Sequence, residues 1–303
     1  MTTSFVRANV ANLYAAPDTA SEMVSQALCG APVNVSDTSG DFCLIQTADR
    51  YHGWIRRHLL VDAWDTSEYL TTATAPLFTD VHEHSQPTSD LVTKLPCSSR
   101  VLLAHARTIG EYVPILLVDK TPGYVHRICL DITHNDGNMS SELADPAVRK
   151  SLDMQALRRE IASAVGERAV DIGRRFVGTP YLWGGTSPFG IDCSGFTQLC
   201  YRLSGVQLLR DADPQFRDGR FTRVDEGMPL DEAPLLCGDL VAFSRHHDGK
   251  ITHIGMADGA GRFLHSSGGR GVYFDWCASE HYLATFVGAI RLSPDADLSI
   301  DAA

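Results

Sequence analysis

The sequence predicts a multidomain protein in which two small all-β barrels precede a larger α+β domain. The chain has 303 residues, which is more than one domain of about 100–150 residues ordinarily holds. A β-rich pattern occurs twice, at 12–60 and at 76–130. From about residue 153 a helical pattern and then a series of short strands follow, an order typical of α+β domains.

The two β-rich stretches resemble each other. Each contains short runs of Val, Ile, Leu and Tyr interrupted by Gly, Pro, Asp and Ser, as in strands joined by turns. The alternative is one larger β-domain whose strands only look repetitive. Three pairs align, with an offset that drifts from 64 to 70 as loop insertions would make it: Leu13-Tyr14 with Leu77-Phe78, Met23-Val24 with Leu91-Val92, and Trp54-Ile55 with Tyr124-Val125.

The polar stretch "DITHNDGNMSSELADPAVRK" is rich in turn residues and predicts a linker after the barrels. The last residues, "SPDADLSIDAA", are acidic and are expected to be disordered. We therefore expect a first barrel at 1–64, a second barrel at 65–134, a linker at 135–152, the α+β domain at 153–293 and a tail at 294–303.

Periodicity predicts the elements of the α+β domain. Apolar residues recur near the helical period from about 153 to 176, and this pattern ends before Gly178. A second helix is predicted at 193–204, with Gly205 as its C-terminal stop. Five short strands are then predicted, as an antiparallel meander: 239–243, 253–257, 262–266, 272–276 and 286–292.

Composition excludes several classes of protein. A net charge of −11 and a pI near 5.5 disfavour a nucleic-acid partner, which needs a basic face. No apolar run approaches the ~20 residues of a membrane span, so no membrane partner is expected. The N-terminus lacks a signal-peptide pattern, so we expect a cytoplasmic protein, although a chain with its export signal removed would look the same. Eight cysteines without a C-x-x-C pair predict reduced thiols and no metal or other cofactor.

Cys193 is the candidate nucleophile. It lies in "GIDCSGF", at about the first position of the helix predicted at 193–204. Unpaired backbone N–H groups and the positive end of the helix dipole gather there, so we expect them to lower the pKa of the thiol. The alternative is a packed structural cysteine, as Cys200 on the apolar face of this helix is expected to be.

A nucleophilic thiol needs a base, and two histidines have the spacing to provide one. The turn sequence "DGAG" separates the strands that carry His253 and His265. A hairpin centred on Gly259 places these histidines directly opposite each other, with Ile254 opposite Leu264 on the other face. His253 is then the base and His265 the group that orients it. A solvated histidine pair and a metal site are the alternatives, although no third ligand is spaced to complete a metal site.

Five sequence segments together are similar to a known enzyme family. They occur in the order found in the NlpC/P60 family of papain-like cell-wall cysteine peptidases, and they cover nearly half the chain. The barrels ahead of them resemble bacterial SH3-like domains, as in the γ-D-glutamyl-L-diamino acid endopeptidase subgroup. The resemblance implies a papain-like fold for the α+β domain. The segments are "YLWGGTSPFGIDCSGF" (181–196), "LRDADPQF" (209–216), "GDLVAF" (238–243), "HIGM" (253–256) and "FLHSSG" (263–268).

The resemblance implies a role for each matching residue. Cys193 matches the nucleophile, His253 the base and His265 the orienting third residue, in agreement with the hairpin argument. In the subgroup, the residues that flank the nucleophile, here Asp192 and Ser194, help to hold the free amino group of the substrate. The position of Asp192 equally suits a helix N-cap, and the two roles are compatible.

Three further residues match positions around the family's cleft. Trp183 matches a tryptophan of the cleft wall. Tyr51 matches a tyrosine that the first SH3-like domain directs into the active site, and the alternative for it is a half-buried strand residue. Asp211 matches the aspartate of a "PRD" motif, but a leucine replaces the proline here, which leaves the shape of this loop open.

The resemblance implies hydrolysis of the bond between γ-D-glutamate and a diamino acid. The substrates would be murein (peptidoglycan) stem peptides with a free N-terminal L-alanine, in cell-wall recycling. One alternative is another papain-like reaction on the same residues, such as that of an amidase or acyl transferase. The other is a non-catalytic murein-binding protein, which has no need of Cys193, His253 and His265 together.

Overall fold

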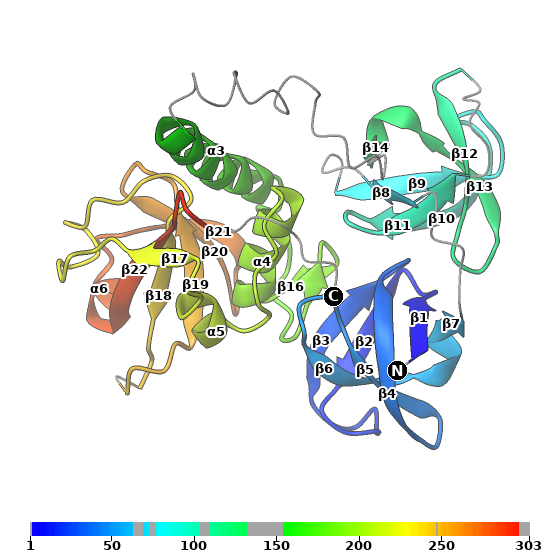
Figure 1. Cartoon of the computed structure of the whole chain (residues 1–303), viewed down its shortest axis with the longest axis horizontal. Helices are drawn as coiled ribbons and strands as arrows, with labels where there is room; N and C mark the ends of the chain where they lie inside the picture. Colours follow the sequence, from blue (N-terminus) through cyan, green and yellow to red (C-terminus); the bar gives the residue numbers. More distant parts are fainter. Residues whose placement is uncertain are drawn as a thin grey trace. The chain divides into compact units, whose positions relative to one another are not determined.

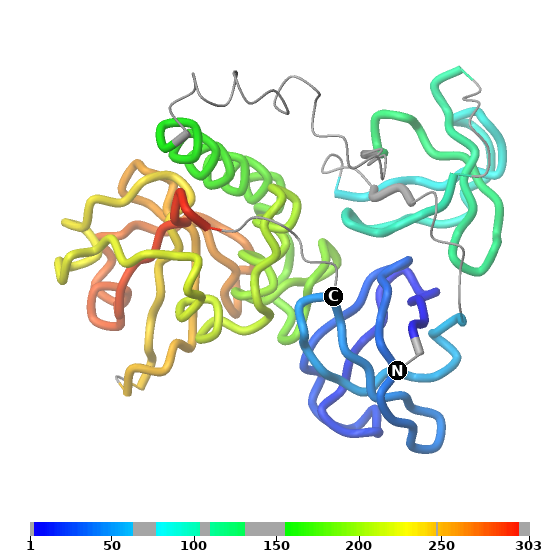
Figure 2. The backbone as a smooth tube through the Cα atoms, viewed as in Figure 1, coloured from blue at the N-terminus to red at the C-terminus, as the bar shows by residue number. Residues whose placement is uncertain are grey.

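The chain, shown as a computed structural model in Figures 1 and 2, forms two compact units. The first contains Met1–Asn135 together with Leu182–Ile191, and the second contains Asp136–Tyr181 and Asp192–Ala302. The predicted linker at 135–152, most of the predicted tail and the predicted boundary between the barrels lie outside the described residues. Those residues are 2–62, 69–72, 77–103, 110–131, 154–246 and 248–296.

The first seven strands form one antiparallel sheet in the order β3-β2-β6-β5-β4-β1-β7. Alternate side chains point inward, and Val6, Leu13, Ile45 and Ile55 are fully buried in the core. A short 3-10 turn, η1 (Arg57–Leu59), precedes the last strand. The strands are β1 (Thr2–Val6), β2 (Val10–Tyr14), β3 (Met23–Leu28), β4 (Pro32–Ser39), β5 (Phe42–Gln46), β6 (His52–Arg56) and β7 (Leu60–Asp62).

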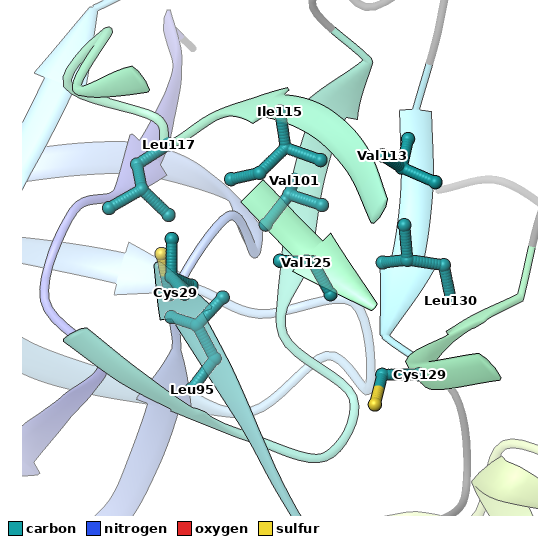
Figure 3. Close-up of a cluster of buried hydrophobic side chains, with 10 residues drawn as sticks. Cys29, Leu95, Val101, Val113, Ile115, Leu117, Val125, Cys129 and Leu130 are labelled. Carbon is teal, nitrogen blue, oxygen red and sulfur yellow. The ribbon is translucent and has the colours of Figure 1, made fainter. Parts of the chain in front are cut away.

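The next seven strands repeat this topology in the order β10-β9-β13-β12-β11-β8-β14. Each strand takes the place of the strand seven positions earlier, which confirms the predicted repeat. Figure 3 shows the core of this second barrel, where Leu95, Val101, Ile115 and Val125 are fully buried. The elements are β8 (Tyr69–Thr72), β9 (Phe78–His82), β10 (Leu91–Pro96), β11 (Arg100–Leu103), β12 (Tyr112–Leu116), β13 (Pro122–His126), η2 (Arg127–Cys129) and β14 (Leu130–Asp131).

Strand pairing gives the true correspondence between the barrels. Tyr14 pairs with Trp54 in the first barrel, and His82 pairs with Tyr124 in the second. His82 is therefore the counterpart of Tyr14, and the predicted alignment of Tyr14 with Phe78 is wrong by four residues. In so short a strand the apolar pattern fits either alignment, and only the cross-strand partners distinguish them. The other two predicted alignments are confirmed.

The two barrels join closely at Cys29. Its side chain lies in the core of the second barrel (Figure 3), and its carbonyl oxygen accepts a hydrogen bond from the Arg100 N–H at 2.8 Å. The next residue, Gly30, has a φ of +76°, and a Cβ there would lie 2.2 Å from the Arg100 carbonyl oxygen. Glycine is required at this position both by the backbone conformation and by the contact.

The second unit contains a six-stranded sheet in the order β17-β22-β18-β19-β20-β21. The five predicted strands are present, but the predicted meander is wrong at its end, because β22 returns to pair with β18. A meander would leave the apolar run "LVAF" of β18 at an edge, whereas here all four residues are buried. The strands are β17 (Phe221–Arg223), β18 (Leu240–Phe243), β19 (His253–Ala257), β20 (Arg262–Ser267), β21 (Gly271–Trp276) and β22 (Phe286–Leu292).

Helices α3 (Met154–Arg175) and α4 (Cys193–Leu203) confirm the two predicted helices, and α5 (Ala212–Phe216) and α6 (Glu280–Thr285) are short additions. Every residue of α4 except Arg202 is buried, because the helix packs against α3 and against β19 and β20. Cys193 therefore begins a helix at the centre of this unit. Within the described residues, none of the helices combines the length and the hydropathy needed to cross a membrane.

We predict that Gly30→Ala destabilises the protein more than Gly40→Ala does. Both glycines have positive φ, but no atom lies within 4 Å of a Cβ built at Gly40, whereas one at Gly30 clashes with Arg100. The control should lose about 1 kcal/mol from backbone strain and Gly30→Ala at least about 2 kcal/mol. Urea unfolding of both variants measures the difference, and equal losses would contradict the role given to this contact.

Candidate active site

Cys193 is the first residue of α4, as the sequence predicts. Asp192 caps the helix, because its Oδ1 accepts a hydrogen bond from the Gly195 N–H at 2.7 Å. Cys193 is only 8% exposed. The backbone N–H groups of Ser194 and Ile254 act on its sulfur, and Ile254 directly follows His253 on β19. The thiol therefore lies beside the strand that carries the predicted base.

The thiol is neutral in this structure. Burial, and after it the Asp192 carboxylate, raise the pKa of Cys193 to about 12, while the N–H groups of Ile254 and Ser194 and the charge of Arg210 oppose the rise. The expected lowering of this pKa by the helix N-terminus is wrong, because desolvation outweighs it here. A thiol in this state becomes a nucleophile only when a base removes its proton.

His253 and His265 are in contact. The Nε2 of His253 lies 2.8 Å from the Nδ1 of His265, and the two rings are inclined by 79°. His265 is fully buried, whereas His253 is half-buried. Within the part of the chain that the structure describes, no group of three His, Cys, Asp or Glu side chains is placed to hold a metal ion.

The hairpin that carries the histidines has a register different from the predicted one. Leu264 lies opposite Met256 instead of Ile254. The turn lies at the predicted residues 258–261, but the pairing is centred on Ala260 instead of Gly259. There the Asp258 carboxylate accepts hydrogen bonds from two backbone N–H groups that follow it, at 2.9 and 3.2 Å. Side chains alternate along a strand, so a shift of two residues keeps both histidines on one face. They meet as diagonal neighbours.

Gly255 makes room for this diagonal contact. In the observed register it is opposite His265, and a Cβ there would lie 3.0 Å from the His265 Cβ and 2.8 Å from the Phe263 ring. A larger residue would push against His265. The glycine of "HIGM" therefore has a packing reason that its sequence context does not reveal.

The contact determines which nitrogen can act on Cys193. The Nε2 of His253 is engaged with His265, so Nδ1 is the nitrogen left for the thiol proton. For Nδ1 to be unprotonated, Nε2 must carry the ring proton and donate it to the Nδ1 of His265. The proton of His265 then lies on its own Nε2, which is buried and has no hydrogen-bond partner among the described residues. In this protonation state Nδ1 of His253 is a proton acceptor, as the predicted role of base requires.

Both histidines are neutral near pH 7. Burial, with smaller effects of Arg245 and His281, lowers the pKa of His253 to about 4. Burial, followed by the electrostatic effects of His253, in its protonated form, and of Arg270, lowers the pKa of His265 to about 2. A neutral imidazole and a neutral thiol are the forms from which general-base catalysis starts.

Arg210, which the sequence reasoning missed, joins two of the predicted substrate-binding residues. It is 2% exposed, and its guanidinium contacts the Asp192 carboxylate at 2.6 and 3.1 Å and the Ser194 hydroxyl at 3.0 Å. A two-point contact of this kind fixes the geometry of a carboxylate. The sequence contains one signal for this residue, which is a charged side chain directly after the mainly apolar run "VQLL". Nothing in the sequence of this loop indicates that the side chain is buried.

Gln215 is a second missed residue. It is fully buried, its carbonyl oxygen accepts a hydrogen bond from the Thr197 hydroxyl at 2.7 Å, and its amide donates to the carbonyl oxygens of Ser194 and Leu209 at 2.9 and 2.8 Å. Gln215 therefore ties α5 and the loop before it to the first turn of α4. It carries no sequence signal of its own beyond the motif "LRDADPQF".

Tyr181 also lies near the thiol. Burial is the main cause that raises the pKa of its hydroxyl to about 12, followed by the electrostatic effects of Cys193, in its ionised form, and of the Asp192 carboxylate. The hydroxyl therefore remains protonated at neutral pH.

The three remaining predicted residues lie on separate elements. Trp183 is 59% exposed, and its indole N–H donates to Glu22 at 2.8 Å. Asp211 is exposed and occupies the N-cap position of α5. Tyr51 is half-buried and directly precedes β6. Tyr51 and Trp183 belong to the first unit and Cys193 to the second, so their parts in one active site stay predictions.

Comparison with known proteins identifies both parts of the chain. The profile of the NlpC/P60 family matches residues 178–291, and the profile of the bacterial dipeptidyl-peptidase SH3 domain matches residues 13–60. A crystal structure of an NlpC/P60 family protein from Bacillus cereus has a TM-score of 0.76 at 22% identity, covering 96% of this chain and 99% of that one. The structural similarity therefore covers the fold of both units.

Two curated relatives extend the comparison. A γ-D-glutamyl-L-lysine dipeptidyl-peptidase of Bacillus cereus is 27% identical over 294 residues, which cover 91% of this chain and 77% of the relative. A probable endopeptidase of Corynebacterium glutamicum is 33% identical over 157 residues, which cover 52% of this chain and 68% of the relative.

We predict that the protein loses stability as the pH falls below about 6.5. The His265→Asn variant should lose less stability than the wild type over the same pH range. The folded-state pKa values of His253 and His265 are lowered to about 4 and about 2, so the unfolded chain binds more protons in this range. The stability that the two neutral histidines contribute is complete above pH 6.5, and it declines as the pH falls toward their folded-state pKa values. At pH 5 each histidine lowers the free energy of unfolding by up to about 2 kcal/mol relative to its value at neutral pH.

Urea unfolding at pH 7.5 and pH 5 measures this dependence. His58 is exposed, so His58→Asn serves as the control and should keep the wild-type dependence. If His265→Asn loses as much stability between the two pH values as the wild type, the buried neutral state of His265 is refuted.

Proposed function

Because this chain belongs to the NlpC/P60 family of cysteine peptidases, we propose that it cleaves the bond between γ-D-glutamate and the diamino acid of murein stem peptides. The substrates are released peptides with a free N-terminal L-alanine, and the reaction serves cell-wall recycling. The contact of His253 with His265 beside the thiol of Cys193 carries the assignment of the chemistry. The name of the Bacillus cereus relative, whose alignment covers 91% of this chain, supports the proposal for which bond is cut.

In the proposed mechanism, Cys193 attacks the γ-carbonyl carbon of the substrate. His253 Nδ1 takes the thiol proton as the carbon–sulfur bond forms, and its Nε2–H keeps its hydrogen bond to His265. Negative charge develops on the carbonyl oxygen. The Cys193 N–H lies in the first turn of α4, where backbone N–H groups have no intrahelical partner, and it is the proposed donor to that oxygen.

The reaction then proceeds through a thioester. His253 gives its proton to the leaving amine of the diamino acid, and the carbon–nitrogen bond breaks. A water molecule next loses a proton to His253 and attacks the thioester carbon. The carboxylate of the γ-D-glutamyl product leaves, and His253 returns the proton to the Cys193 sulfur.

Asp192, Ser194 and Asp211 are the proposed binding residues for the substrate ammonium group. Arg210 holds the Asp192 carboxylate and the Ser194 hydroxyl in one arrangement. Because Asp192 is paired with Arg210, the exposed carboxylate of Asp211 is the proposed charge that attracts the cation. An ammonium withdrawn from water needs such a partner.

The contrast between the barrels supports a role for Tyr51. Its carbonyl oxygen accepts a hydrogen bond from the Thr47 N–H, and so closes the loop before β6. The counterpart in the second barrel is Thr121, and there the same loop contacts the first barrel through Asp119, which lies 3.6 Å from Arg7. In the second barrel this loop thus contacts the first barrel. The corresponding loop of the first barrel instead carries the large, half-buried side chain of Tyr51.

We predict that Cys193→Ala lowers kcat for L-Ala-γ-D-Glu-diaminopimelate or its lysine counterpart by about 10⁴-fold or more, because the nucleophile is lost. Cys200→Ala, which removes a buried thiol from the same helix, is the control and should keep nearly full activity. Mass spectrometry of the products measures the turnover and shows which amide bond is cut. Near-wild-type activity of Cys193→Ala would rule out the nucleophile, and cleavage at another bond would indicate the amidase alternative.

We predict that Tyr51→Phe and Asp211→Asn weaken cleavage of peptides with a free amine more than cleavage of N-acetylated peptides. Tyr51→Phe removes a hydroxyl that can accept a hydrogen bond from the ammonium group, and Asp211→Asn removes a negative charge, so kcat/KM for the free amine should fall about tenfold or more relative to the acetylated peptide. Tyr124→Phe, on a strand of the second barrel, is the control for Tyr51→Phe. Equal losses on both peptides would refute the proposed amine pocket.

A further inference from the structure

The ten residues before Asp192, Leu182–Ile191, cluster with the first barrel in the first unit. They form a small hairpin of β15 (Thr186–Ser187) and β16 (Gly190–Ile191), in which Thr186 pairs with Ile191. The hairpin packs against β3. The chain leaves it at Ile191, which is fully buried, and reaches Cys193 two residues later.

Gln26 on β3 binds the hairpin at two points. Its side-chain oxygen accepts a hydrogen bond from the Thr186 N–H at 3.0 Å, and its backbone oxygen accepts one from the Thr186 hydroxyl at 3.3 Å. The side-chain amide of Gln26 donates to Asn12 at 3.0 Å. This second bond fixes which end of the amide faces Thr186, so the acceptor is preorganised.

Two contacts flank this one along the same strand edge. The exposed Glu22 accepts the hydrogen bond of the Trp183 indole N–H at 2.8 Å. Gly184 has a φ of +74°, and a Cβ there would lie 2.7 Å from the Met23 carbonyl oxygen. The hairpin thus approaches β3 as closely as a glycine permits.

The counterpart strand in the second barrel, β10, has different residues at these positions. Strand pairing with an offset of 68 aligns Gln26 with Lys94 and Glu22 with Asp90. Lys94 forms an ion pair with Asp80 of its own barrel at 2.5 Å. The residues that bind the hairpin are therefore particular to the first barrel and are not required by the barrel fold.

From this we propose that β3 of the first barrel positions the chain segment that leads into Cys193, with Gln26 as the positioning residue. Gln26 holds Thr186, Thr186 is paired with Ile191, and Ile191 precedes the helix cap Asp192. The first barrel is then a structural part of the catalytic apparatus as well as a recognition domain. This inference rests on the proposed function of Cys193 as the nucleophile.

The test measures three quantities for Gln26→Ala, Gln26→Glu and the control Lys94→Ala. They are kcat and KM for the free stem tripeptide, the rate of Cys193 alkylation by iodoacetamide, and the thermal unfolding midpoint. Gln26→Ala should lower kcat about tenfold or more, since small displacements of reacting groups cost that much, with a smaller change in KM and slower alkylation. Gln26→Glu keeps the acceptor oxygen and should recover most of the activity.

Equal kcat and equal alkylation rates for Gln26→Ala and Lys94→Ala would overturn the inference. If Gln26→Ala does not fold, Glu22→Ala at the exposed neighbouring contact takes its place: loss of kcat with slower alkylation supports the inference, and unchanged rates overturn it. If the wild type itself does not cleave the peptide, the proposed substrate is wrong, while the alkylation rates still test the positioning.

Discussion

The hydrogen bond between His253 and His265 is the interaction on which the rest of the site depends. It exists because the two strands bring both side chains to one face and because Gly255, opposite His265, leaves the space for it. Burial keeps both rings neutral. The bond also leaves Nδ1 as the nitrogen of His253 that is not engaged with His265, and so it determines the direction of proton transfer in the proposed mechanism.

Burial gives the site a neutral resting state. The thiol of Cys193 has a raised pKa despite its place at a helix N-terminus, so in the proposed mechanism His253 has to generate the reactive thiolate during the reaction. The Asp192–Arg210 pair next to it is also buried, and its bidentate geometry offsets the desolvation of both charges. The charges that surround the thiol are thus arranged before any substrate arrives.

Much of the second unit could be predicted from the sequence, because both helices and five of its strands follow simple periodicities. The contact between the histidines was predictable for the same reason, since residues of like parity share one strand face. The register was not, because it depends on the conformation of the turn, in which the Asp258 carboxylate accepts two backbone hydrogen bonds. Arg210 was not either, because its partner Asp192 lies 18 residues earlier and no local pattern connects them. The pKa of Cys193 followed from burial, which a helix position alone does not reveal.

The central claim is that His253 presents an unprotonated Nδ1 to Cys193 because its Nε2 donates to His265. Nitrogen-15 NMR of the histidine rings at pH 7 tests this claim most directly, since it distinguishes protonated from unprotonated ring nitrogens. The account predicts protonated Nε2 and unprotonated Nδ1 in both His253 and His265. A proton on Nδ1 of His253, either as the other neutral tautomer or as the imidazolium, would contradict it.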